Sequence, residues 1–351
     1  MLQPPDLRQP RMRVLVNGVE TAGALRAEIT SNNHYAADRF RLDMQTNTTG
    51  ANTWSAIDQA QIEIQLSLDG VGYASVIHGD IDQLRIDPRA LRVTLEGRDF
   101  TSRFIQARTQ ETFANQTSSQ IAAILAARRG LSAKVTATTT PVGAYWQLEH
   151  DRTTLDSFSR TVSEWDLLIT LASHEGFDVF VSSTTLYFQP PVISTPQTIV
   201  LSQQPTLNGP ANLMSLSMER SLTLAGNIAV TVRSWNSRLA QSFVQTVTSS
   251  GTASPSQTFV YVVPNLTPDA ALRLAQSRLA ELTSHERVIE ADMPGELTLM
   301  PRQQIMLAGT KTAFDQLYWI DEVTRRLDVQ SGFTQSLRAR NSSVLANSIG
   351  E

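Results

Sequence analysis

Histidines and acidic residues are the side chains of this sequence that could bind a metal or carry out acid–base catalysis. The 5 histidines are scattered along the chain, and no two of them share a helix at the spacing of metal ligands. His174 and Glu175 are adjacent, but the second histidine of a zinc-binding helix does not follow them. The sequence therefore predicts no metal site, and His174 is better placed near a helix end, where it complements the helix dipole.

Three acidic residues of the central region, Asp151, Asp166 and Glu175, could form the carboxylate pair of a glycoside hydrolase. Asp166 stands three residues after Ser163, a spacing that is better explained by a helix cap. The sequence has no nucleophile elbow, phosphate-binding loop or dinucleotide motif, and it has no cysteine. We therefore predict that the chain is not an enzyme, with no catalytic residue, no cofactor and no metal.

The composition indicates a folded protein without a nucleic-acid or membrane surface. The chain has 351 residues, 41% of them apolar and 18% charged, which is typical of two to three domains with real cores. The net charge of −4 comes with no basic stripe that could grip DNA or an anionic membrane. No apolar run reaches the roughly 20 residues that span a bilayer, and the first residues do not form a signal peptide, so no membrane insertion is expected.

Alternating apolar residues dominate the first 97 positions. Phe40, Leu42 and Met44 share one face of a predicted strand, and residues 60–68 alternate strictly before a turn at Asp69-Gly70. Residues 45–55 are polar and are expected to form a loop. Many antiparallel strands at short spacing predict a barrel or a sandwich.

Residues 98–193 have the pattern of a small α/β unit. Thr117 and Gln120 form a capping box ahead of a helix that should end at Gly130. Ser163 and Asp166 repeat this box ahead of a second helix, and an aromatic hairpin follows. From residue 194 strands return, with one helix predicted over 268–284.

Three segments of the sequence carry a resemblance to a known family. The first contains Gly97, Asp99, Phe113, Asn115, Thr117, Ile121 and Gly130-Leu131. The second is "SEWDLLITLASHEGFDVF", and the third comprises the C-terminal strands from "GELTLMPRQQIML" onward. In this order they resemble the phage late control protein D family, the baseplate or tail-tip hub proteins of tailed phages and related contractile particles. Two positions depart from the family pattern: Arg302 follows Pro301 where a glycine is usual, and Thr324-Arg325 stand where a histidine is frequent.

The resemblance implies a mainly β (α+β) fold of two tail-tube-like β-barrels with an inserted small α/β domain. The expected domains are barrel 1 over 1–97, the insertion over 98–193, barrel 2 over 194–345 and a tail over 346–351. Residues 198–215 fit either barrel. Gly97, Asp99 and Gly130 mark the junction between the first barrel and the insertion.

The resemblance also implies a structural function in the virion, in a protein made in the host cytoplasm. Three copies would form a pseudo-sixfold ring, a homotrimer that joins the hexameric tail tube to the trimeric spike and lets DNA pass without specific binding. Expected partners are the tail tube or a distal tail protein, the central spike protein, the tape measure protein and other baseplate proteins. The candidates for an acidic channel wall are Glu63, Asp80, Asp82 and Glu96.

Two other classes of function stay open from the sequence. One is a tail-associated peptidoglycan hydrolase, which would need an acid–base pair in a pocket. The other is a carbohydrate-binding tip protein, which would need an exposed platform of aromatic side chains.

Overall fold

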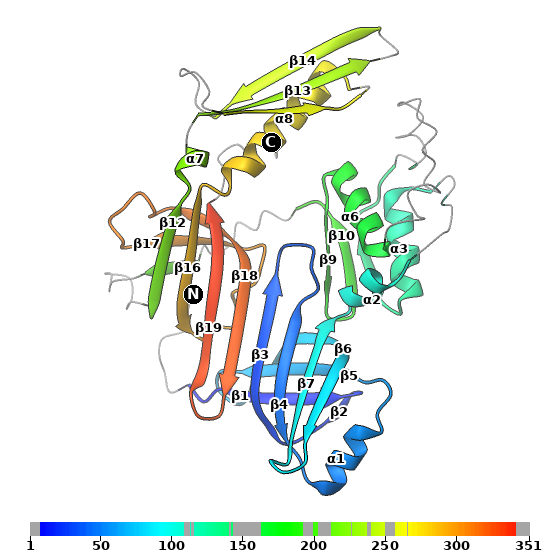
Figure 1. Ribbon diagram of the computed structural model, residues 1–351, viewed down its shortest axis with the longest axis vertical. Helices are drawn as coiled ribbons and strands as arrows, with labels where there is room; N and C mark the ends of the chain where they lie inside the picture. Colours follow the sequence, from blue (N-terminus) through cyan, green and yellow to red (C-terminus); the bar gives the residue numbers. More distant parts are fainter. Residues whose placement is uncertain are drawn as a thin grey trace.

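The computed structural model describes residues 8–108, 113, 116–139, 142, 163–191, 199–202, 212–225, 227–236, 240–249, 257–264 and 266–341. Strands make up most of the described secondary structure, and helices are gathered in a few places (Figure 1). The mainly β class predicted from the sequence is therefore confirmed. Residues 346–351, Asp151 and Asn115 lie outside the described residues.

The first half of the large sheet is built from alternating strands that curl around one core. The inward residues include Ile29, Leu42, Ile64 and Leu95, all of them fully buried. Behind β3, β4 and β7, the strands β1 and β5 run across, so the sheet closes over these side chains (Figure 1). The strands are β1 (Arg11–Val16), β2 (Val19–Glu20), β3 (Ala24–Asn32), β4 (Arg39–Gln45), β5 (Gln61–Ser67), β6 (Ala74–Asp87) and β7 (Arg92–Asp99).

The second half continues the same sheet, because β18 pairs with β3 in antiparallel fashion. Its own core gathers side chains such as Ile289, Ile305, Tyr318 and Leu337. The strands are β11 (Ile199–Ser202), β12 (Ser215–Arg220), β16 (Arg287–Pro294), β17 (Gln304–Ala308), β18 (Leu317–Asp328) and β19 (Gly332–Asn341).

The two halves repeat one strand order. In the first half this order is β3-β4-β7-β6-β5-β1, and in the second it is β12-β16-β19-β18-β17-β11. The strands also succeed one another along the chain in the same sequence, so each has a counterpart in the other half. The outermost pairs differ in direction, since β1 is antiparallel to β5 and β11 is parallel to β17.

An irregular detail recurs at the same place in both halves. β6 bulges against β7 after Ile81, and β18 bulges against β19 after Ile320. The extra residue is an aspartate in each case, and each pairs with an arginine of the next strand: Asp82 with Arg98 at 2.6 Å, and Asp321 with Arg340 at 3.2 Å. Bulges are specific devices of a sheet, so their recurrence indicates that the halves are two versions of one barrel-like unit.

The α/β unit follows β7 and has a separate core of buried side chains between Phe100 and Phe188. Both predicted capping boxes are confirmed: the Thr117 hydroxyl accepts from the Gln120 amide, and Ser163 accepts from Asp166. The elements are α2 (Thr101–Gln106), α3 (Ser118–Arg128), β8 (Ser132–Val135), α6 (Glu164–Glu175), β9 (Asp178–Ser182) and β10 (Thr185–Gln189).

A further small unit is inserted between β12 and β16. The sequence placed these residues within the second barrel, whereas the structure gives them a separate three-stranded sheet, β14-β13-β15, with one face covered by the helix α8. Ile228, Val230 and Val232 point from β13 into that core against Ala275 and Leu279. The elements are α7 (Leu222–Ala225), β13 (Ile228–Asn236), β14 (Gln241–Thr248), β15 (Gln257–Val262) and α8 (Pro268–Thr283).

The expected loop at residues 45–55 is wrong, because α1 (Thr48–Ser55) is helical. The Asn47 side chain accepts from the Gly50 amide at 2.7 Å and so caps the helix start. Trp54 is buried against the first barrel-like core and fixes the helix there. None of the helices within the described residues has the length and apolarity needed to cross a membrane.

Candidate functional site

The junction between the first half of the sheet and the α/β unit begins where β7 passes close to its neighbours. At Gly97 an added Cβ would lie 2.2 Å from the Asp80 carbonyl oxygen and 2.5 Å from the Phe40 ring. Distances this short leave no room for a side chain, so close packing requires glycine here. At Gly97, β7 therefore packs directly against the backbone of β6 and the Phe40 ring of β4.

Asp99 organises the turn from β7 into α2. Its Oδ2 accepts from the Thr101 hydroxyl at 2.8 Å, its carbonyl accepts from the Ser102 hydroxyl, and its amide donates to the Asp38 carbonyl. Asp99 is 7% exposed, and its Oδ1 has no hydrogen-bond partner among the described residues. Burial raises the pKa of Asp99 well above its ordinary value, and the nearby charge of Asp38 adds to this effect.

Asp38 is the second carboxyl group of this corner, and the sequence did not single it out. Its Oδ1 accepts from the Asn32 amide at 2.9 Å and from the Asn32 side chain at 3.3 Å. Burial raises the pKa of Asp38 to about 6, although these hydrogen bonds favour the charged form. The two carboxyl groups hold the β3–β4 turn against the start of α2.

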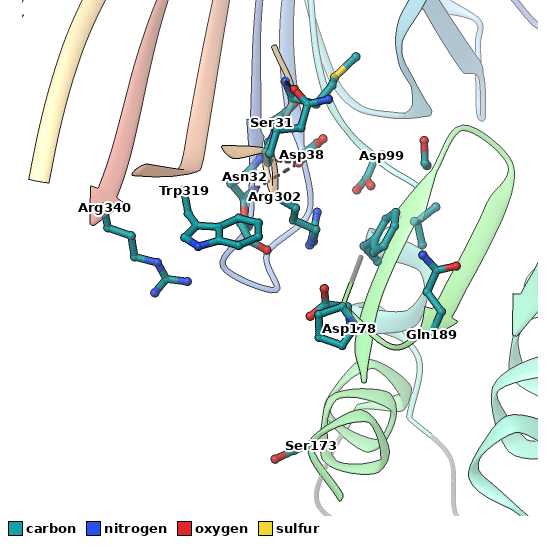
Figure 2. A pocket seen from close by; sticks show the side chains of 18 of the residues that line it. Ser31, Asn32, Asp38, Asp99, Ser173, Asp178, Gln189, Arg302, Trp319 and Arg340 are labelled. Atoms are coloured by element: carbon teal, nitrogen blue, oxygen red, sulfur yellow. Dashed lines mark hydrogen bonds between the residues drawn. The ribbon is translucent and has the colours of Figure 1, made fainter. Parts of the chain in front are cut away.

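A cavity of about 1180 Å³ opens beside this pair, where both halves of the sheet, the α/β unit and α8 approach one another. Figure 2 shows Arg302 lying among the carboxyl groups of Asp38, Asp99 and Asp178. The Arg302 guanidinium stacks over the Phe180 ring at 4.5 Å from its centroid. Burial lowers the pKa of Arg302 and raises that of Asp178, so both charges are held in poorly solvated positions.

The charged side chains around this cavity hold neighbouring elements of the fold together. The hydrogen bonds of Asp38 and Asp99 go to main-chain groups and to neighbouring side chains of the same turn. In the described part of the chain, histidine and acidic side chains form no group that could hold a metal. Glu175 lines the cavity, and Asp166 serves its helix cap as predicted.

Ion pairs fasten the α/β unit to the sheet next to the junction. Arg103 of α2 binds Asp80 of β6 through two bonds of 2.7 and 2.8 Å, and its Nη1 also donates to the Arg129 carbonyl at 3.1 Å. Arg129 in turn grips the fully buried Glu164 side chain with bonds of 2.7 and 2.6 Å. Gly130 ends this stretch in the left-handed conformation, with φ of 73°, as a helix stop requires.

The four acidic candidates for a channel wall all have polar partners. Asp80 is held by Arg103 and Asp82 by Arg98, and Glu96 accepts from Arg41 at 2.9 Å. Glu63 accepts from the Gln65 side chain at 2.9 Å, and it lies on β5 rather than on the strands that connect the two halves. The charges of Asp80, Asp82 and Glu96 are therefore largely offset by arginine, which the sequence could not reveal.

Comparison with known proteins gives matches in structure alone. No family model and no curated protein sequence matches the chain. A tail protein from Neisseria meningitidis MC58 superposes with a TM-score of 0.69 and 17% identity, covering 95% of this chain and 96% of that protein. The 43 kDa tail protein of prophage MuSo2 from Shewanella oneidensis gives a TM-score of 0.67 and 16% identity over 95% and 99% of the two chains.

A component of the type VI secretion system from E. coli is also similar, with a TM-score of 0.59 and 12% identity over 95% of this chain and 77% of that one. Identities this low establish the fold rather than the activity. The chain therefore has the fold of these phage tail and secretion-system proteins over nearly its whole length.

Proposed function

We propose that this chain is a structural hub of a phage tail or phage-like particle. Three copies form a pseudo-sixfold ring that joins a hexameric tail tube to a trimeric spike. The observation that carries the proposal is the duplication: two units of one strand order and one bulge lie side by side in a single continuous sheet. Three such chains present six similar units around one axis, which is how threefold order can match sixfold order.

The domain division in this proposal keeps the boundaries expected from the sequence, with one refinement. The barrels correspond to the cores around Ile64 and Ile305, and the α/β insertion corresponds to the core between Phe100 and Phe188. The unit of β13–β15 and α8 is then a second insertion, carried by barrel 2 between β12 and β16.

The channel wall in this proposal is the outward face of the eight strands from β12 to β6. Cross-strand pairs of opposite charge cover it, such as Glu96 with Arg41, Glu28 with Arg326, and Glu290 with Arg338. Arginines neutralised in this way give DNA few free cationic contacts, and DNA affinity grows with the number of such contacts. Asp82 and Glu96 belong to this wall, whereas Asp80 supports the junction and Glu63 lies on β5.

The proposed partners are the tail tube or a distal tail protein on one side and the central spike protein on the other. The tape measure protein and further baseplate proteins complete the surroundings of the hub in the virion. The likeness to phage tail proteins over at least 95% of each chain supports this setting. A hydrolase is less well supported, because the carboxyl pair of Asp38 and Asp99 is engaged in structural hydrogen bonds.

Mass measurement by light scattering, followed by electron microscopy of the same sample, tests the proposal. We expect a trimer, either of the chain alone or after addition of the spike protein, and ring-shaped particles with threefold symmetry. A chain that stays monomeric with both the tube and the spike protein present would overturn the hub. Clearing of cell-wall material by the pure protein, or binding on a glycan array, would favour the two other classes instead.

A further inference from the structure

Within the described residues, the strands β12, β6, β2 and β11 of the large sheet each have an edge without a partner strand, and the first two of these edges concern the sheet that joins the two halves. β12 pairs with β16 on one side and has no neighbour on the other. β6 pairs with β5 from Ala74 to Asp80, which leaves that edge open from Gln83 to Asp87. Open edges with free amide and carbonyl groups are natural sites for pairing with another chain.

The duplication shows what normally fills the open stretch of β6. Its counterpart β18 uses the same edge twice: Leu317–Trp319 pair with β17, and Glu322–Asp328 pair with β3. The residues after the bulge in β6 correspond to those after the bulge in β18. The counterpart of β3 is β12, so the missing neighbour of β6 is a strand of the β12 type.

The β12 of the same chain cannot serve as this neighbour. The strands β16, β19, β18, β3, β4 and β7 lie between β12 and β6. At roughly 4.8 Å per strand, the two edges are about 33 Å apart along the sheet. A second copy of the chain is the occupant that supplies the matching strand.

We propose that β6 of one copy pairs in antiparallel fashion with β12 of a second copy, in the register of the ladder between β18 and β3. This inference rests on the proposed function, because repetition of such a head-to-tail contact closes a ring. Aligning the two halves by their bulges and by the pairing of β16 with β12 fixes the register. The cross-copy pairs, with the residue of the second copy given last, are Gln83–Ser221, Leu84–Arg220, Arg85–Glu219, Ile86–Met218 and Asp87–Ser217.

The proposed contact between β6 of one copy and β12 of the next, called the seam below, brings complementary side chains together. Arg85 faces Glu219 of the second copy, and neither forms an ion pair within the described part of its own chain. Within one chain the corresponding pair is Thr324 and Thr30, whose hydroxyl oxygens lie 3.1 Å apart. Ile86 faces Met218 of the second copy, and Met218 is 38% exposed in the single chain.

The geometry of the Arg85–Glu219 pair suits a cross-linking test. Asn33 donates to the Asp321 carbonyl and Val329 to the Leu25 carbonyl, which places Thr30 and Thr324 in a pair without backbone hydrogen bonds. The Cβ atoms of such pairs are the closest in an antiparallel sheet, and disulfides favour them. The natural chain has 0 cysteines, so every disulfide in a variant is an introduced one.

The experiment is mild oxidation of the R85C/E219C variant of the full chain, followed by a non-reducing gel. We expect covalent trimers that separate into single chains when the disulfides are reduced. The variant R85C/S217C is the control, because a shift of two residues puts the Cβ atoms about 7 Å apart and should give at least tenfold less cross-linked product. Equal or stronger cross-linking of the control would overturn the proposed register.

The mass of the unmodified chain separates this inference from the proposed function. If light scattering shows a trimer but R85C/E219C does not cross-link, the proposed pairing of β6 with β12 is wrong and the proposed hub function still stands. A monomer in the presence of tube and spike proteins, again without cross-linking, would overturn both.

Discussion

Asp38→Asn is the substitution that best tests how the carboxyl pair of Asp38 and Asp99 affects stability. The ordinary pKa of this group is 3.8, and burial raises the pKa of Asp38 to about 6 in the folded chain. Each pKa unit corresponds to about 1.4 kcal/mol, so ionised Asp38 costs the folded state up to about 3 kcal/mol. The coupling to Asp99 reduces the expected value to about 1–3 kcal/mol.

The raised pKa of Asp38 determines the direction in which the stability difference changes with pH. The folded chain binds the proton more tightly than the unfolded chain, so the contribution of Asp38 is fully present below pH 3.8 and is lost as the pH rises through about 6. Asparagine keeps an oxygen for the Asn32 amide and carries no charge. We therefore expect the variant to gain stability over the natural chain as the pH rises from 4 to 7.

Urea unfolding at pH 4, 5, 6, 7 and 8, followed by circular dichroism, measures this difference. Asp69→Asn is the matched contrast, because hydrogen bonds from the Val71 and Gly72 amides lower the pKa of Asp69 to about 2. That variant should lose stability at neutral pH, and the loss should fade as the pH falls towards 2. A constant or falling advantage of Asp38→Asn from pH 4 to pH 8 would refute the reasoning.

Four further substitutions test the junction and the seam. Gly97→Ala should destabilise the chain by about 3 kcal/mol or more in urea unfolding, since its Cβ meets a carbonyl oxygen at 2.2 Å, whereas Gly72→Ala, with 3.9 Å of space, should change stability by less than about 0.5 kcal/mol. Glu164→Gln should cost about 3 kcal/mol in the same assay, because it removes the fully buried partner of two arginines; a loss below about 1 kcal/mol would contradict a structural role. Arg85→Glu and Glu219→Arg should each weaken trimer formation about tenfold in light scattering, and the variant that carries both substitutions should form trimers as the natural chain does. If each single variant weakens the trimer and the double variant does not restore it, the proposed pairing of Arg85 with Glu219 is wrong.

Local signals in the sequence predicted the helices of the α/β unit well. A capping box consists of two residues three positions apart in the sequence. Thr117 with Gln120 and Ser163 with Asp166 could therefore be recognised without any knowledge of the fold. Helix α1 was missed because its segment is polar and rich in threonine and asparagine, which favour turns. Its helix depends on the Asn47 cap and on burial of Trp54, and the second of these is a tertiary effect.

The charged cavity could not be predicted because its members come together from distant parts of the chain. Asp38 lies in a turn, Asp178 starts β9, and Arg302 precedes β17. One signal was nevertheless present: Arg302 stands where the late control protein D pattern usually has glycine. Its φ of 70° lies in the left-handed region, which explains why glycine suits this position and why an arginine there is unusual.

The places where the extra units are inserted also bear on how the chain can assemble. The α/β unit leaves the sheet after β7, and the unit of β13–β15 with α8 leaves it between β12 and β16. Both lie beyond the same end of the long strands, and the hairpins between β6 and β7 and between β18 and β19 turn at the opposite end (Figure 1). A unit inserted along the open stretch of β6 or beside β12 would block strand pairing, whereas units placed beyond one end leave both edges free. The same placement lets both halves of the sheet, the α/β unit and α8 surround the cavity of Arg302 at that end. The charged cavity and the open strand edges therefore both result from where the two units are inserted.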